Sequence, residues 1–198
     1  MIKVCFYDGS KLIKGGAELI ALPIPEGAVL WIDIEDEPIE SEQVIFDQFD
    51  CHPLTIQDAR RLRHPPKTEH FSDQSFVLVR ELSAESAGFT LDTLQISSFI
   101  GDKFLITRHD KPSNAIALWW DSDVLEHKIA RGPMLLFASI TNSIGLNYLD
   151  LVLDFEPLIS GYEDTLLSSP DDSVLRELIA CKTWLRKLKR LHSYHDRV

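Results

Sequence analysis

The hydrophobic periodicity of the chain changes near Pro112, and this change constrains the fold more than any other feature. Before Pro112, β-rich runs alternate with turn residues, and the loop of residues 101–103 suggests a hairpin. After Pro112, apolar residues recur at steps of three and four, which is typical of helices. The sequence therefore predicts a mixed α and β fold with a helical carboxy-terminal part. The expected strands are residues 2–7, 29–34, 76–82, 91–100 and 104–107.

Helices are expected both between the strands and after them. Apolar positions in residues 39–62 indicate two short helices divided by Pro53. We expect one helix over residues 115–129 and one or two long helices over residues 134–167. Proline and glycine at positions 157 and 161 are places where a long helix can bend.

The last predicted helix carries a heptad stripe and is open at its end. Ser169 is its expected N-cap, Pro170 its first residue, and two aspartates follow beside the positive end of the helix dipole. The chain stops before any capping residue, which fits either a helix cut midway or a fraying terminal helix. The stripe consists of Val174, Leu178, Cys181, Leu185 and Leu188, continued by His192 and His195.

The charge balance points to cations as ligands. The chain has 20 basic and 31 acidic residues, a net charge of −11, so nucleic acid is not an expected partner. Residues 172–198 depart from this balance, with seven basic and three acidic side chains. Three cysteines without a CxxC pair argue against a disulfide framework and indicate a reducing compartment.

Neither a leader nor a membrane span is expected in this chain. The acidic Asp8 closely follows the first residues, which is unlike a signal peptide and indicates a mature cytosolic start. Residues 132–149 are uncharged over 18 positions, near the lower limit for crossing a bilayer. Polar residues at 141–143 and 147 favour a buried core helix instead.

Two acidic sites are candidates for cation binding, and no catalytic signature is present. GxGxxG, Walker, GxSxG and HExxH motifs are absent, so we expect no enzyme. The histidines lack ligand spacing, and His192-x-x-His195 lacks further ligands. Asp58 is expected in the first turn of a short helix capped by Thr55. A cation-attracting loop, or else a solvated loop, is expected at Asp33, Glu35, Asp36 and Glu37.

Several segments together resemble the cytoplasmic domain of the CorA family of divalent-cation channels, which includes the zinc transporter ZntB. Their order and spacing across almost the whole chain carry the resemblance. They are WIDIEDEP (31–38), HPLTIQDARR (52–61), HPPKTEHFSDQSFVLVREL (64–82), LQISSFIGDKFLITRH (94–109) and LLSSPDD (166–172).

The resemblance implies a fold and an assembly. The fold is an α/β/α sandwich with a mixed sheet, followed by long helices leading into a stalk helix. Its parts would be an α/β domain at residues 1–131, a helical pair at 132–169 and the start of a truncated stalk at 170–198. In the full-length protein the stalk would lead to two membrane spans and a Gly-Met-Asn pore loop, absent here, and copies would form a pentamer. The implied oligomer face is Val174, Leu178, Leu185 and Leu188.

The resemblance also implies a function and metal ligands. It predicts a soluble cytoplasmic regulatory domain, at the inner face of the cell membrane, of a transporter for Mg²⁺, Co²⁺ or Zn²⁺. Regulatory Mg²⁺ or Zn²⁺ would bind between subunits at Asp58, beside Gln57 where the family has Glu, and at Asp150, one turn from Asn147. Two alternatives remain open: a helical protein-interaction module, and a metal-dependent hydrolase using Asp33 and Asp58.

Overall fold

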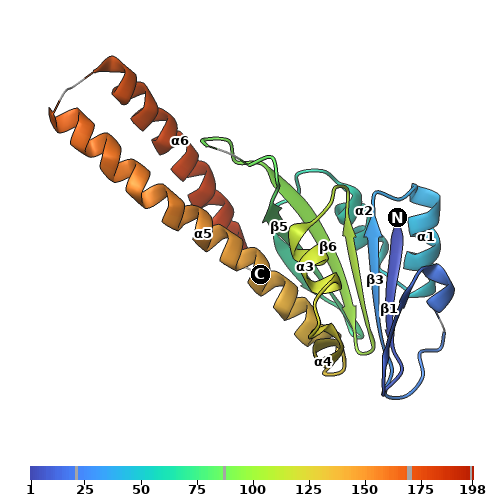
Figure 1. Ribbon diagram of the computed structural model, residues 1–198. Coiled ribbons are helices and arrows are strands. Elements are labelled where there is room, and N and C mark those ends of the chain that lie inside the picture. The colour runs from blue at the N-terminus through green and yellow to red at the C-terminus, as the bar shows by residue number, and fades with distance from the viewer. Residues whose placement is uncertain (21, 87, 169–170, 197) are drawn as a thin grey trace.

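The computed structural model describes residues 1–20, 22–86, 88–168, 171–196 and 198, and it contains one seven-stranded mixed sheet (Figure 1). The strand order is β2-β1-β3-β7-β6-β5-β4, in which only β3 and β7 pair in parallel. All five expected strands are present, and the two that the sequence did not indicate are short edge strands. The strands are β1 (Ile2–Tyr7), β2 (Leu12–Gly15), β3 (Val29–Glu35), β4 (Lys67–His70), β5 (Gln74–Leu82), β6 (Thr93–Gly101) and β7 (Phe104–His109).

Helices cover both faces of the sheet, so the predicted α/β/α sandwich is confirmed. Alternation along β3 places Leu30 and Ile32 on one face and Val29 and Trp31 on the other. The first face packs against α1 (Ile39–Gln48) and α2 (Pro53–Arg60). The second packs against α3 (Asn114–Trp120), α4 (Leu125–Ile129), α5 (Pro133–Ser168) and α6 (Asp172–His195). A short 3-10 turn, η1 (Ala17–Leu19), follows β2.

The start of α2 differs from the prediction in its cap. His52 is the N-cap, and its Nδ1 accepts a hydrogen bond from the Leu54 amide at 3.3 Å. Pro53 is the first helical residue, where its missing N–H costs nothing. Thr55 lies inside the helix and donates its hydroxyl to the His52 carbonyl at 2.7 Å. Asp58 therefore lies in the last turn of α2, and its predicted place in the first turn is wrong.

The single helix expected over residues 115–129 is instead two helices. Ser113 caps α3 by accepting from the Ile116 amide at 3.0 Å. The helix ends at Trp120 with Asp121 as its C-cap, and the Ser122 hydroxyl accepts from the Val124 amide at 3.3 Å. Short polar side chains compete in this way with the helical backbone bonds, which explains the break between α3 and α4.

The helical pair expected over residues 132–169 is one helix of 36 residues, α5, which continues through Pro157. It is long and apolar enough to cross a membrane by length and composition, a test that core helices also pass. Leu136, Ile140 and Ile144 in its first half are buried against the sheet, as in a core helix.

The last helix does not extend away from the domain as a stalk: α6 runs back along α5. Tyr162 donates to Glu177 at 3.2 Å, and Tyr148 packs against His195 at the other end. These contacts make the pair antiparallel, and its far half projects beyond the sheet (Figure 1). The expected start signals at Ser169 and Pro170 lie outside the described residues, and Asp171 is the N-cap.

The heptad stripe packs only partly inside the chain, so the fold takes up part of the predicted oligomer face. Cys181 and Leu188 are buried in the core shared with α5, as is the neighbouring Trp184. The remaining members of the predicted face are half-buried or exposed: Val174 and Leu178 half-buried, Leu185 exposed. Folding back onto α5 supplies the apolar partner that the stripe requires.

Candidate metal sites

A buried polar cluster lies where the parallel strands β3 and β7 end. Their register places Asp33 opposite Thr107 and Glu35 opposite His109. Thr107 donates its hydroxyl to Asp33 Oδ1 at 2.6 Å, and His109 Nε2 lies 3.1 Å from the same oxygen. Trp31 Nε1 donates to the Thr107 hydroxyl at 3.0 Å, which fixes the direction of that chain of bonds. Asp33 and His109 are almost wholly shielded from solvent.

The hydrogen bonds of His109 determine its protonation. Nδ1 lies 2.6 Å from the Lys111 carbonyl, which can only accept, so Nδ1 carries a hydrogen. Nε2 faces a carboxylate and is therefore protonated too. Burial disfavours the charged ring, but the hydrogen bond and charge of Asp33 outweigh it and raise the pKa of His109. Both ring nitrogens of His109 thus face oxygen acceptors, an arrangement that favours the protonated ring.

The same cluster has the composition of a metal site. One ligand atom from each of Asp33, Glu35 and His109 can be chosen so that all lie within 4.8 Å of one another. Asp33 Oδ2 is buried without a hydrogen-bond partner in the described part of the chain. The bond from Nδ1 to a backbone carbonyl leaves Nε2 as the ligand nitrogen, as in many zinc sites. A metal ion would take the place of the Nε2 proton, and mixed nitrogen and oxygen donors suit Zn²⁺.

The predicted acidic loop is largely not a loop. Asp33 lies within β3 and is buried, and Glu35 ends the strand half-buried. Glu37 is paired with the Met1 amine at 2.7 Å. Only Asp36 is exposed, in a left-handed conformation with φ 46°. The expectation of a loop at all four positions is therefore wrong, because β3 continues through the first part of the acidic run.

Asp58 lies in the last turn of α2, where basic side chains compensate the charge of its carboxylate. Its Oδ2 is bonded to Lys67 Nζ, and its Oδ1 lies 3.5 Å from His64 Nε2. Lys67 also contacts Glu69 at 2.8 Å. Burial disfavours the Lys67 ammonium, but the two carboxylates outweigh it and raise its pKa. Asp58 keeps 22% of its side-chain surface exposed, so a cation could reach it by displacing Lys67.

Asp150 is exposed on α5, and the described residues offer it neither a hydrogen bond nor an ion pair. Within the described ranges, the only close group of three or more metal-binding side chains is Asp33, Glu35 and His109. Asp58 and Asp150 are therefore not part of one preformed site within a chain.

Sequence reasoning missed His109 as a partner of Asp33. The two residues are 76 positions apart and meet only because β3 and β7 are adjacent in the sheet. The sequence feature that could have revealed the pair is that Asp33 and His109 each lie near the end of a β-rich run. Recognising it requires knowledge of the strand order.

Comparisons with known proteins agree with this fold. Residues 26–198 match the family described as CorA-like Mg²⁺ transporter protein. YfjQ of Bacillus subtilis (strain 168), whose name assigns it to the metal ion transporters, is 26% identical over 171 residues. That alignment covers 84% of this chain and 51% of YfjQ. The chain thus spans about half the length of this curated relative.

Two solved structures share the fold. The soluble domain of CorA from Methanocaldococcus jannaschii superposes with a TM-score of 0.68 at 20% identity, covering 90% of this chain and 70% of that one. The ZntB cytoplasmic domain from Vibrio parahaemolyticus RIMD 2210633 gives 0.66 at 18% identity, covering 96% and 74%. At these identities the likeness establishes the architecture, including the long carboxy-terminal helices.

Proposed function

The chain belongs to the family of CorA-like Mg²⁺ transporter proteins, and from this we propose that it is the cytoplasmic regulatory domain of a divalent-cation transporter. In this proposal, the domain binds Mg²⁺ or Zn²⁺ at the inner face of the membrane and adjusts a pore for Mg²⁺, Co²⁺ or Zn²⁺. The pore would lie in the part of such proteins that this chain does not span, and copies of the domain would assemble around it as a pentamer.

The observation that carries the proposal is the family match over residues 26–198. The likeness to soluble domains of CorA and ZntB supports the location of the chain beside the membrane, and the net charge of −11 supports cations as its ligands. The chemistry of regulation depends on which carboxylates become available to an ion.

Asp58 is the proposed regulatory ligand, and its ion pair defines how it would work. A divalent ion competes with Lys67 for the carboxylate, and Lys67 retains Glu69 as a partner when it is displaced. Binding would then rearrange the connection between α2 and β4. An exposed carboxylate of a second copy, for which Asp150 is the candidate, would complete the ligand set. Loss of the ion would return Asp58 to Lys67 and remove the bridge between the two copies, which would loosen the assembly.

Sedimentation velocity tests this proposal on the chain as it is. Samples would contain EDTA, millimolar Mg²⁺ or micromolar Zn²⁺. We expect faster sedimentation with a divalent ion, and loss of this response in Asp58→Asn. Asp123→Asn, which removes an exposed carboxylate between α3 and α4, should respond like the unchanged protein. Identical sedimentation of all three proteins under every condition would reject a metal switch at Asp58.

We also propose that the domain has no enzymatic activity, in keeping with a transporter family. The Asp33 carboxylate of the hydrolase alternative is buried and already bonded to Thr107 and His109. The interaction-module alternative required a free heptad stripe, but Cys181 and Leu188 of this stripe are buried in the core shared with α5. A panel of phosphoester substrates with Mg²⁺ or Mn²⁺ should show no turnover.

A further inference from the structure

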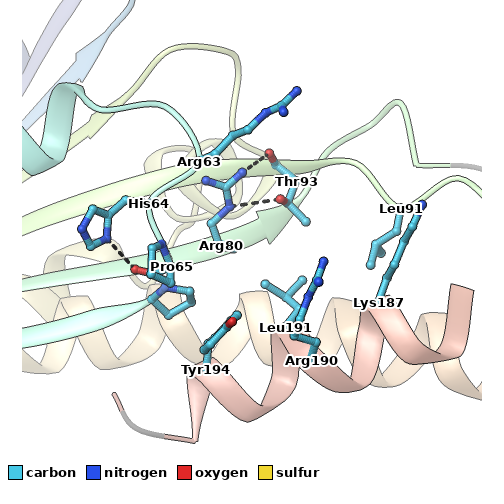
Figure 2. Close-up of a pocket in the computed structure, with 11 residues that line it drawn as sticks. Arg63, His64, Pro65, Arg80, Leu91, Thr93, Lys187, Arg190, Leu191 and Tyr194 are labelled. Atoms are coloured by element: carbon cyan, nitrogen blue, oxygen red, sulfur yellow. Dashed lines mark hydrogen bonds between the residues drawn. The ribbon is translucent and has the colours of Figure 1, made fainter.

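A cavity of about 380 Å³ lies between the sheet and α6 and is lined by basic side chains (Figure 2). Arg63 and His64 come from the connection between α2 and β4, and Arg80 comes from β5. Lys187 and Arg190 rise from α6 toward these strands. Arg80 from the sheet and Lys187 and Arg190 from α6 thus direct positive charge toward one space (Figure 2).

These charges lack counter-ions in a protein that has an excess of acid. In the described residues, Arg63, Arg80, Lys187 and Arg190 make no ion pair with a carboxylate. Some bases elsewhere in the chain are paired: Arg60 and Arg108 both contact Glu42, for example. Clustered like charges repel one another, and the repulsion is strongest where solvent is partly excluded. An anion in the cavity would remove it.

Arg80 is held in place without being neutralised. Its Nε donates to the Thr93 hydroxyl at 3.0 Å and its Nη2 to the Thr93 carbonyl at 3.0 Å. Its Nη1 donates to the Gln95 amide oxygen at 3.3 Å. A guanidinium has five N–H groups, so two remain for a ligand. Burial is the main reason that the pKa of Arg80 is lowered; the charge of Asp92 opposes this shift and that of Arg63 adds to it.

The walls of the cavity are not only charged. Leu191 and Tyr194 of α6 form apolar or aromatic surface beside the basic groups (Figure 2). Pro66 also lines the cavity. A volume of about 380 Å³ lies within the usual range for small-molecule sites. The combination suits a ligand with a multiply charged anionic part and an organic part, rather than a simple halide.

We propose that this cavity binds a small organic phosphate of about nucleotide size. Arginine forks match phosphate oxygens, and charge-assisted hydrogen bonds of this kind are among the strongest in proteins. Such a ligand would contact Arg80 in the sheet and Lys187 and Arg190 on α6, and would thereby fasten the α5–α6 hairpin to the sandwich. This inference concerns an anion and does not require the divalent-cation site proposed above, although both involve the connection between α2 and β4.

Isothermal titration calorimetry in EDTA at fixed ionic strength tests it, with ADP and inorganic phosphate as probes and chloride as background. We expect ADP to bind more tightly than inorganic phosphate. The variant Arg80→Gln removes one charge-assisted hydrogen bond to the phosphate and should therefore weaken ADP binding about tenfold. Because Arg80 also bonds to Thr93, the surface pair Lys187→Gln with Arg190→Gln provides a second test that leaves the interior unchanged.

Lys189→Gln is the matched control, because Lys189 is on the same helix but does not line this cavity. It should bind ADP like the unchanged protein. The proposal would be overturned if neither probe binds, or if all variants bind ADP equally. It would also be overturned if phosphatidylglycerol vesicles capture the protein through Arg190 while the free phosphates do not bind, because the site would then be a lipid contact.

Discussion

At the scale of single residues, the uncharged ring of His195 connects α6 to the sheet by a hydrogen bond. Its Nε2 accepts a hydrogen bond from the Arg80 amide at 3.0 Å, so this nitrogen carries no proton. Burial, with the nearby charges of His192 and Arg80, lowers the pKa of His195 to about 4. Protonation would break the bond and place a charge beside Arg80.

Acidification should therefore weaken this attachment. In the unfolded chain His195 titrates near its usual pKa of about 6.5. Between about pH 6.5 and pH 4 the unfolded state binds more protons at His195 than the folded state does. The stability that His195 contributes is therefore complete above about pH 6.5 and is lost progressively as the pH decreases toward 4.

Urea denaturation at pH 7.5 and pH 5 measures the effect before most carboxylates titrate. His195→Gln keeps an acceptor for the Arg80 amide but cannot be protonated, so its loss of stability between the two pH values should be smaller. Equal losses for the two proteins would show that His195 is not responsible.

Residue types predicted part of the candidate sites, but not the state of the side chains. Asp33 and Asp58 were both recognisable as carboxylates in short polar stretches. Their neutralising partners were not, because Thr107 and His109 reach Asp33 through strand register, and Lys67 reaches Asp58 through the turn into β4. A local pattern gives the charge of a residue, whereas its availability to a metal depends on contacts made by distant segments.

At the scale of elements, the α5–α6 hairpin is held by an aromatic stack. The Phe155 and Trp184 rings lie 3.8 Å apart and are nearly parallel, at 8°. Trp184 is 1% exposed, and its Nε1 has no hydrogen-bond partner in the described structure. The indole thus contributes packing but also carries an unsatisfied buried donor.

Two substitutions should separate these contributions. Trp184→Ala removes the stack and should cost about 3–5 kcal/mol. Trp184→Phe keeps a ring against Phe155 and removes the unpaired N–H, so it should cost clearly less. Urea denaturation followed by far-ultraviolet circular dichroism measures both. Equal losses would mean that the stack does not hold the hairpin.

Element types were predictable where the sequence pattern is long. The β-rich runs of β3 and β5 and the helices divided by Pro53 could be placed from sequence, whereas the four-residue strands β2 and β4 give too short a signal. The direction of α6 could not be predicted. A heptad stripe shows that a helix needs an apolar partner, but it does not say whether that partner is the preceding helix or another copy.

At the scale of the whole molecule, the charge of the chain has two consequences that must be separated. A net charge of −11 causes repulsion within the folded protein, and any salt screens this repulsion. A divalent ion bound at the proposed site would stabilise the folded state further, beyond this screening. The basic cavity beside α6 shows that the excess of acid does not extend evenly over the surface. Stability in salt therefore reports screening and binding together unless ionic strength is held constant.

Thermal unfolding in MgCl₂ and NaCl at matched ionic strength separates the two effects. Screening raises the melting temperature equally in both salts, whereas a bound ion stabilises only the folded state. At ten times its dissociation constant an ion adds about 1.4 kcal/mol, or about 4 °C for a chain of this size. We expect this excess in Mg²⁺ to vanish in Asp58→Asn and to persist in Asp123→Asn. Matching curves for the unchanged protein would mean that the acidic surface attracts divalent ions only as a diffuse atmosphere, and that regulation by a bound ion does not reside in this domain.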